Sequence, residues 1–588
     1  MSRFFTSVLL ILLLLAGVAF ASEDVVLKAM RDELARSMKD LKLKDLEKPY
    51  FMSYRVDEWT SFSVSASLGA ITNRGETRRR MLSVDVRVGN YEFDNTNFLA
   101  VDSFGSRMFR NGARVLPLDD DYNQLRREMW LATDAIYRHS ASDLEAKRSV
   151  LQQRSPSTKL DDFLKQQPLS SLEPPKNLTV DMTALERVAR EVSKVFVDEP
   201  EFVSSGVTID VRNLHTRFIN SEGTVFTRPD PVVAAVITAQ IYGKDGVPIK
   251  DSVTVLGTVI SDVDHAVVLD KTRQLISNLK ALREASPVQR YNGPVLFEGE
   301  AAGEVVSQVF APAVAAFRFP ITDKPEFEAG FLQFTAQFGG VSLAEKLGAR
   351  VTPEFMDIVD DPAATDFAGS RLLGTRKIDD EGVTSRAVKI VEGGILKNIL
   401  STRTPTPECK ESTGSKRMFG PTPSNLIFSS RKSMTAHEIR GELLRLAKLR
   451  GYDYGIVVRR VGPAGLSWIT RMGANAAGRA GSAATATGVF KVYADGREEM
   501  VRGGEIEVLT TSAFRDIVAA GDKPQVYTTA FVPLASSIFA GLSGNMAGDA
   551  LSVVSYVVPS LLFEQLTIKP GSGVAPTPPV LSSPLLAR

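Results

Sequence analysis

Two glutamates in the segment FEGEAAGEVV stand at a spacing that could support chemistry. Glu300 and Glu304 are four residues apart, so a helix would place both on one face, where like charges repel each other. If the pair is buried, a proton, a cation or an arginine must offset that repulsion. Acid and base catalysis by the pair alone would also need a nucleophile and an oxyanion stabiliser, and the sequence names neither. The candidate arginines are Arg371, Arg386 and Arg417.

Other residues suited to metal or nucleophilic chemistry are few. His437 and Glu438 look like the start of a zinc-peptidase helix, but the position of the second histidine is Gly441. Thr435 and Glu438 instead predict a capping box at a helix N-terminus. Cys409 is the only cysteine and has no histidine nearby, so we expect neither a disulfide nor a functional thiol. The histidines lack the spacing of a metal-binding pair: His139, His215, His265 and His437.

The N-terminus reads as a secretory signal peptide. Arg3 precedes an apolar run from Val8 to Phe20, and Ala19 and Ala21 form an A-x-A cleavage pattern. We therefore expect residues 1–21 to be removed and the protein to be periplasmic or extracellular. The alternative is an uncleaved membrane anchor, although the apolar run is shorter than the roughly 20 residues of a spanning helix.

Composition excludes several classes of protein. The chain has 588 residues, of which 44% are hydrophobic and 24% charged, so it can bury large cores in several domains. Loss of Arg3 with the signal peptide takes the formal net charge from +1 to 0. A neutral chain gives no electrostatic reason to expect binding to nucleic acid or to an anionic membrane.

The pattern of the mature chain predicts an α+β protein with three blocks and a tail. Residues 22–165 begin with an amphipathic helix over 22–43, continue with alternating strands, and end in a helix over 121–154. The strands are separated by turn signals at Gly69, Asn73 to Gly75, and Gly89. Residues 180–287 predict a helix, strands and a second helix over 262–286. Residues 288–570 predict a β-rich domain, and the Pro- and Ser-rich tail 571–588 predicts disorder.

The third block resembles the TldD/PmbA (modulator of DNA gyrase) family of metallopeptidase-related proteins. Four of its motifs carry the resemblance: GPVLFEGEAAGEVVSQVF, DDEGVTSRAVKIVEGGILK, STGSKRM and PSLLFEQLTI. Catalytic members of the family carry an H-E-x-x-x-H helix after a strand like GPVLF. The shared order of motifs spans roughly residues 294–568.

The resemblance assigns family roles to positions at which this sequence departs from the catalytic pattern. The first metal-binding histidine falls on Gly299, the catalytic base on Glu300 and the second histidine on Glu304. A cysteine ligand of the family enzymes falls by rough spacing near Asn545. Because a zinc site needs about three protein ligands, the resemblance implies a metal-free homologue that binds peptide or partners a catalytic TldD-like subunit.

Two alternatives stay open at this stage. In one, the protein is an active metallopeptidase in which Glu300, Glu304 and a distant carboxylate hold a metal; only such a rearrangement would leave zinc as a cofactor. In the other, the acidic residues are structural and the protein is a stand-alone binding or scaffold protein. The distant carboxylates are Asp360, Asp361, Asp379, Asp380 and Glu381.

The segment Asp379-Asp380-Glu381-Gly382 has both a structural and a functional interpretation. Aspartate tolerates turn geometry and glycine supplies positive φ, so the segment predicts a tight turn. The resemblance also makes Asp379, Asp380, Glu381 and Arg417 candidates for lining a substrate cavity.

Overall fold

The computed structural model describes most of the chain outside the N-terminal segment. The described residues are 24–43, 46–100, 114–154, 160–330, 342–417, 420–462, 482–507, 509–531, 552–570, 581 and 584–587. The predicted signal peptide, Asn545 and most of the tail lie outside them. Pro584–Ala587 form a 3-10 turn. Within the described residues, no helix is both long and apolar enough to cross a membrane.

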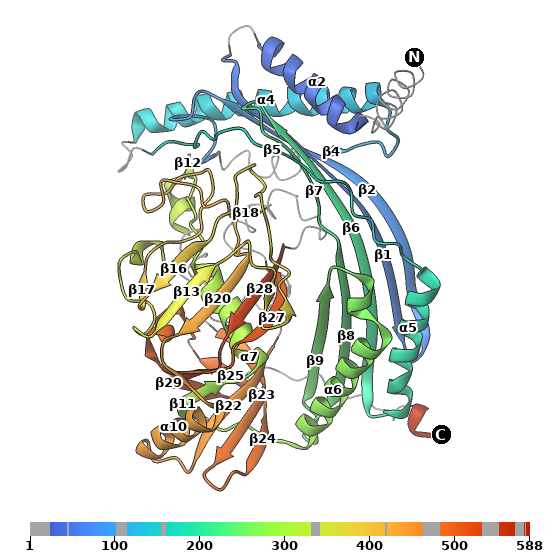
Figure 1. The fold of residues 1–588 in the computed structure, drawn as a ribbon, viewed down its shortest axis with the longest axis vertical. Helices are drawn as coiled ribbons and strands as arrows, with labels where there is room; N and C mark the ends of the chain where they lie inside the picture. Colours follow the sequence, from blue (N-terminus) through green and yellow to red (C-terminus); the bar gives the residue numbers. More distant parts are fainter. Residues whose placement is uncertain are drawn as a thin grey trace, which may run out of the picture.

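A long curved sheet forms the N-terminal half (Figure 1). Strands from the first two predicted blocks share it, because β1 pairs with β6 from Ser53↔Asn220 to Ala66↔Val207. Division of these blocks into separate domains stays a prediction. The order is β4-β2-β1-β6-β7-β5, with β8 beside β6 and β9 beside β8. The strands are β1 Pro49–Ser67, β2 Ala70–Val88, β4 Arg114–Val115, β5 Ser170–Leu172, β6 Phe202–Asn220, β7 Val225–Pro229, β8 Val232–Tyr242 and β9 Pro248–Gly257.

The hairpin between β1 and β2 confirms one predicted turn and corrects another. Leu68 and Gly69 have φ of 50° and 80°, the positive values of a two-residue hairpin turn. The predicted turn at Asn73 to Gly75 is wrong, because these residues continue β2 and pair with β1. Pairing along the whole hairpin outweighs the local turn preference of Asn and Gly.

Four helices cover one face of this sheet. Alternate residues of β1 point to that face: Met52, Tyr54 and Val56 pack with α2 and α4, while Val64 and Ala66 pack with α5 and α6. The intervening residues, including Arg55, point the other way, toward the C-terminal half. Each predicted helix is present, although α2 begins after Asp24 rather than Ser22. The helices are α2 Val25–Asp40, α4 Tyr122–Gln153, α5 Met182–Lys194 and α6 His265–Glu284.

The C-terminal half is β-rich, with two sheets around a buried helical segment. The larger sheet has the order β10-β24-β23-β22-β11-β29-β26-β21, with β25 beside β23 and β29; the smaller has the order β17-β16-β13-β20-β28-β27. One hydrophobic cluster joins both sheets to helix α7 (Glu300–Val305) and the turns that follow it. Helix α10 (Ala436–Leu449) covers the outer face of the larger sheet through Ile439 and Leu443.

The strands of the two C-terminal sheets are mostly short. Those of the larger sheet are β10 Ser286–Pro287, β11 Tyr291–Phe297, β21 Ser433–Met434, β22 Tyr454–Val461, β23 Ser482–Tyr493, β24 Glu498–Arg502, β25 Gly504–Glu507, β26 Ile517–Gly521 and β29 Leu561–Lys569. Those of the smaller sheet are β13 Met356–Asp360, β16 Val388–Glu392, β17 Ile395–Leu396, β20 Asn425–Ser430, β27 Gln525–Phe531 and β28 Ser552–Val558. Three small pairs lie outside them: β3 Phe98–Leu99 with β12 Ile321–Thr322, β14 Asp366–Phe367 with β15 Ser370–Arg371, and β18 Lys416–Arg417 with β19 Gly420–Pro421.

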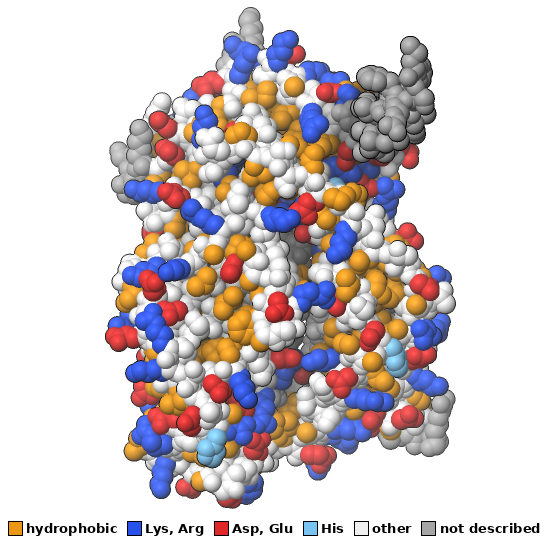
Figure 2. All heavy atoms as spheres, in the orientation of Figure 1, with side chains coloured by type: hydrophobic (Ala, Val, Ile, Leu, Met, Phe, Trp, Pro, Cys, Tyr) orange, Lys and Arg blue, Asp and Glu red, His pale blue; other side chains and the backbone are white. Residues whose placement is uncertain are grey.

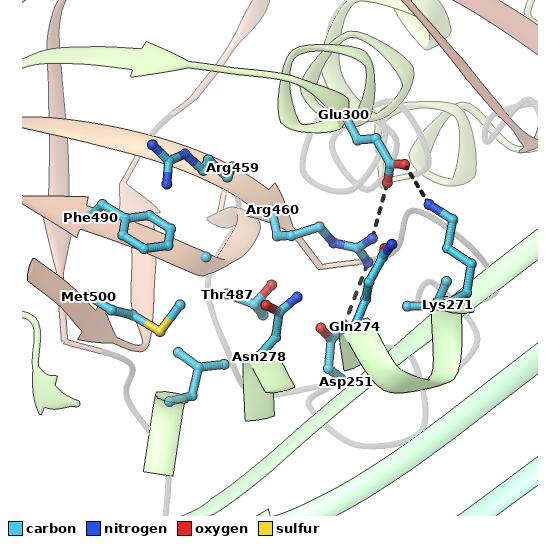
Figure 3. Close-up of a pocket in the computed structure, with 13 residues that line it drawn as sticks. Asp251, Lys271, Gln274, Asn278, Glu300, Arg459, Arg460, Thr487, Phe490 and Met500 are labelled. Atoms are coloured by element: carbon cyan, nitrogen blue, oxygen red, sulfur yellow. Dashed lines mark hydrogen bonds and ion pairs between the residues drawn. The ribbon is translucent and has the colours of Figure 1, made fainter. Parts of the chain in front are cut away.

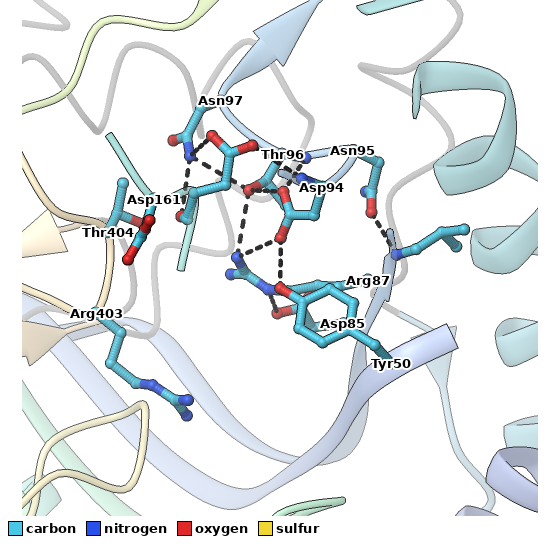
Figure 4. A network of polar contacts seen from close by, with 12 residues as sticks. Tyr50, Asp85, Arg87, Asp94, Asn95, Thr96, Asn97, Asp161, Arg403 and Thr404 are labelled. Carbon is cyan, nitrogen blue, oxygen red and sulfur yellow. Dashed lines mark hydrogen bonds and ion pairs between the residues drawn. The ribbon is translucent and has the colours of Figure 1, made fainter. Parts of the chain in front are cut away.

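Buried polar contacts join the two halves. Phe163 lies between the guanidinium groups of Arg87 and Arg403, which are 3.5 and 3.9 Å from its ring centre. Arg403, from the C-terminal half, also pairs with Glu222 at 2.7 Å. Close to Arg87, Asp94 accepts hydrogen bonds from Tyr50 and Arg87 (Figure 4). The halves are thus fixed to each other by charge-assisted hydrogen bonds as well as by apolar packing.

Candidate functional site

The predicted helix after β11 begins at Glu300. Helix α7 (Glu300–Val305) continues into a π-type turn, Val306–Phe310, and a last turn, Ala311–Ala313. Gly299 precedes it with φ 62° and ψ −135°, a conformation that glycine adopts far more readily than other residues. Gly303 contacts β27 closely, since a Cβ there would lie 2.4 Å from Cβ of Tyr527. The segment is therefore built for close packing of α7 between the sheets.

Arg460 contacts both glutamates, and Figure 3 shows its ion pair with Glu300. Its Nη1 is 3.3 Å from Oε2 of Glu300, and its Nε is 3.4 Å from Oε1 of Glu304. Glu304 is buried and also accepts a 2.6 Å hydrogen bond from the backbone N–H of Val461. Lys271 of α6 contacts the other carboxylate, with Nζ 3.4 Å from Oε1 of Glu300. Two cations thus offset the repulsion between the glutamates.

We expected an arginine such as Arg371, Arg386 or Arg417 to offset the repulsion between the glutamates, and this expectation is wrong. These arginines pair with Asp262, Glu411 and Asp380, respectively. Strand β11 pairs in parallel with β22, with Phe297 opposite Val458. Residues just beyond these positions therefore meet at the same end of the sheet, which brings Arg460 to α7 across 160 residues of sequence.

Burial controls the ionisation of Glu304. It raises the pKa of Glu304 from 4.5 to about 7, although Arg460 and the Val461 N–H both act to lower it. Asp251 of β9, 3.9 Å from Arg460, also has a raised pKa because of burial. The same group of residues thus combines a cation with carboxyl groups that bind protons more readily than usual.

The residues at the family motif do not fit a zinc ion. Gly299 has no donor atom, and Glu304 already contacts Arg460 and Val461, so at most one protein ligand would be free where about three are needed. Across the described ranges, no three side chains of His, Cys, Asp or Glu lie together in a metal-binding arrangement. The distant carboxylates are thus not brought to Glu300 and Glu304, and the neighbourhood of Asn545 lies outside the described residues.

The Asp379 to Gly382 segment forms the predicted turn. Asp379 stabilises the turn, whereas Asp380 forms ion pairs with residues outside it. Gly382 has φ 79°, and Asp379 accepts hydrogen bonds from the backbone N–H groups of Glu381 and Val383. Asp380 instead meets arginines from the curved sheet and from β18. Its partners are Arg55 at 2.6 Å, Arg228 at 2.9 Å and Arg417 at 3.5 Å. The structure therefore brings Arg417 to the turn, and Arg55 and Arg228 were not predicted from the sequence.

The two remaining sequence candidates have structural roles. Thr435 and Glu438 form the predicted capping box at the start of α10, next to His437. Cys409 is half-buried and packs against the C-terminal core, and burial raises the pKa of its thiol. A raised pKa leaves less of the reactive thiolate at neutral pH.

A pocket of about 330 Å³ opens beside Glu300 and Arg460, where α6 and β9 meet the C-terminal half (Figure 3). One part of its wall is apolar and another is polar. Among the described residues, two buried polar atoms of its lining make no hydrogen bond: Oγ1 of Thr487, and Nε of Arg460, whose 3.4 Å contact with Glu304 is an ion pair only. The apolar lining residues are Val253, Leu282, Phe490 and Met500; the polar ones include Lys271, Gln274 and Asn278.

Comparison with solved structures shows the fold. A protein from Thermotoga maritima, named as a candidate modulator of DNA gyrase, is 15% identical with a TM-score of 0.56, and the alignment covers 92% of this chain and 99% of that one. TldE from Thermococcus kodakarensis is 14% identical with a TM-score of 0.54, covering 92% and 100%. A Bacteroides thetaiotaomicron protein with a similar name is 13% identical with a TM-score of 0.52, covering 92% and 98%.

Comparison of sequences assigns the C-terminal half to a domain family. No curated protein matches the chain. Residues 289–570 match the model of the PmbA/TldA metallopeptidase C-terminal domain, the region in which the four sequence motifs and the Glu300–Arg460–Glu304 cluster occur. This C-terminal domain therefore belongs to the TldD/PmbA family.

Proposed function

We propose that this protein is a non-catalytic member of the family that binds peptide, with Arg460 taking the place of the metal ion. The observation that carries the proposal is the contact of one guanidinium group with both Glu300 and Glu304. A zinc peptidase uses its metal to activate water. Here the positive charge at the two motif positions belongs to an arginine. Unlike a metal ion, a guanidinium group cannot coordinate and activate a water molecule.

The environment of Glu300 supports the loss of catalysis. A general base must be free to take a proton from the attacking water. Glu300 instead contacts two cations, Arg460 and Lys271. Its side chain retains 41% exposure, so it can still accept hydrogen bonds from a bound ligand.

The pocket beside these residues supports peptide binding. Its apolar wall offers a place for a side chain, and its amide, hydroxyl and cationic groups can bond to peptide carbonyls. Family members pair a metal-bearing subunit with a metal-free one, so we propose that the chain presents peptide to such a partner. With residues 1–21 acting as an export signal, this would take place outside the cytoplasm.

Binding and cleavage of a denatured protein separate the proposal from its alternatives. Fluorescein-labelled denatured casein is added to the protein beginning at Ser22; anisotropy reports binding and gel electrophoresis reports cleavage. We expect binding without cleavage. Asn278→Trp should fill the pocket and weaken binding, whereas Ser277→Trp, on the adjacent exposed position of α6, should not.

Three results would contradict the proposal. Cleavage that stops with a chelator and with Glu300→Gln would show an active metallopeptidase. Equal binding by wild type and Asn278→Trp would place the peptide elsewhere, and no binding at all would favour a scaffold role.

A further inference from the structure

A second group of buried charges lies around Asp380, where the curved sheet meets the C-terminal half. Arg55 of β1 and Arg228 of β7 approach from the sheet, and Arg417 approaches from β18. Both sheet arginines have additional partners, Asp57 at 2.8 Å and Asp230 at 2.6 Å. Burial acts to raise the pKa of the Asp380 carboxyl, but Arg55 and Arg228 outweigh it and keep that pKa well below the ordinary range.

Arg417 is incompletely satisfied. Its side chain is 6% exposed, and its Nη1 contacts Asp380 at the long distance of 3.5 Å. Its Nη2 is buried and has no hydrogen-bond partner in the part of the chain that the structure describes. A buried donor without an acceptor costs free energy, so such a group in a native protein needs an explanation, and an absent ligand is one.

Arg376 is a second arginine whose charge interacts with that of Asp380. It donates hydrogen bonds only to backbone carbonyls among the described residues, those of Gly374 and Val553. The charge of Arg376 interacts with the charges of Arg228 and Asp380. The residue is partly exposed to solvent. Burial and the Arg228 charge lower its pKa to about 10, a shift that a bound anion would reverse.

The nearby carboxyl groups of the turn and of β13 do not serve as anionic partners of Arg376 and Arg417. Asp360 accepts the backbone N–H of Ser424, and Asp379 accepts three backbone N–H groups, including that of Lys416. Burial raises the pKa of Asp360 to about 7 and that of Asp379 to about 8. Glu381 accepts the backbone N–H of Arg403.

We propose that Arg376 and Arg417 bind a carboxylate group of the peptide. The planar guanidinium group matches a carboxylate through two parallel hydrogen bonds. Nη2 of Arg417 is an unused donor, and Arg376 donates to backbone carbonyls but to no carboxylate among the described residues. This inference rests on the proposed peptide binding and adds a preference for acidic ligands. The carboxylate comes from the peptide C-terminus or from a Glu side chain.

Four acetylated decapeptides of otherwise identical neutral sequence test the inference by anisotropy. One ends in a free acid and one in an amide; the other two are amides with either Glu or Gln at the centre. We expect the free acid or the Glu peptide to bind about ten-fold more tightly than its neutral counterpart. Arg417→Gln and Arg376→Gln should each remove most of that preference, whereas Arg386→Gln, at an exposed ion pair with Glu411, should keep it.

The result also distinguishes failure of this inference from failure of the proposed function. If neutral and acidic peptides bind equally, the carboxylate site is refuted while peptide binding stands. If no peptide binds, the carboxylate site is tested separately by comparing the melting temperature of the protein in acetate with that in chloride of equal ionic strength. Stabilisation by acetate that is lost in Arg376→Gln supports the site, and identical melting temperatures overturn it.

Discussion

Removal of the Arg460 guanidinium tests the electrostatic account of the site. Arg460→Met keeps the length of the side chain and removes its charge. Glu304 is 1% exposed and Arg460 is 20% exposed, so the change leaves a buried carboxylate with only the Val461 N–H. Breaking a buried pair in this way costs about 3 kcal/mol, which we expect as a loss in the free energy of unfolding at pH 8.5.

The cost should depend on pH in a defined direction. The folded-state pKa of Glu304 is about 7, above its ordinary value of 4.5. The contribution of this group to stability is therefore fully present below about 4.5 and is lost as the pH rises through about 7. Loss of Arg460 raises the folded-state pKa further, because a stabilising cation is removed. The variant should lose much less stability at pH 5.5, where Glu304 is protonated, than at pH 8.5.

Urea denaturation at both pH values measures these differences. Arg459→Met is the matched control, because Arg459 is one position away and is 33% exposed in its ion pairs with Glu298 and Glu498; it should cost less than about 1 kcal/mol. Adding Glu304→Gln to Arg460→Met should recover much of the loss at pH 8.5. An equal loss at both pH values, or a loss no larger than the control's, would refute the reasoning.

The other predictions concern the backbone of the motif and can be measured by urea denaturation. Gly299→His should lower the free energy of unfolding by about 1 to 3 kcal/mol, since φ of 62° strains any side chain. Calorimetry should show no zinc binding by this variant. Gly441→Ala, in the exposed helix α10, should instead raise the free energy of unfolding by about 0.5 to 1 kcal/mol. Gly303→Ala should cost about 1 to 3 kcal/mol through its contact with Tyr527. A neutral effect at Gly299 or Gly303 would contradict the close-packed geometry of α7.

The sequence predicts local elements well where one periodic pattern extends over many residues. The helix over 121–154 matches α4 to within a residue at each end, because its capping aspartate and apolar period agree. The capping box at Thr435 is equally local. At Asn73 the local signal was misleading, since strand pairing along the hairpin decided the conformation.

The candidate site was predictable only in part. The family motif located Gly299, Glu300 and Glu304, and the turn signal located Asp380. Their ionic partners could not be read from the sequence, because Arg460 reaches Glu304 through the parallel pairing of β11 and β22, and Arg55 reaches Asp380 across the junction of the two halves. Such contacts depend on sheet order, which carries no short-range signal in the sequence.

The metal content of the purified mature protein tests the central claim most directly. The protein is dialysed against zinc, freed of excess metal and analysed by mass spectrometry for bound ions. Replacement of the metal by Arg460 predicts no stoichiometric metal in the wild type and no change in Glu304→Gln. One equivalent of metal per chain, lost in Glu304→Gln, would contradict the account.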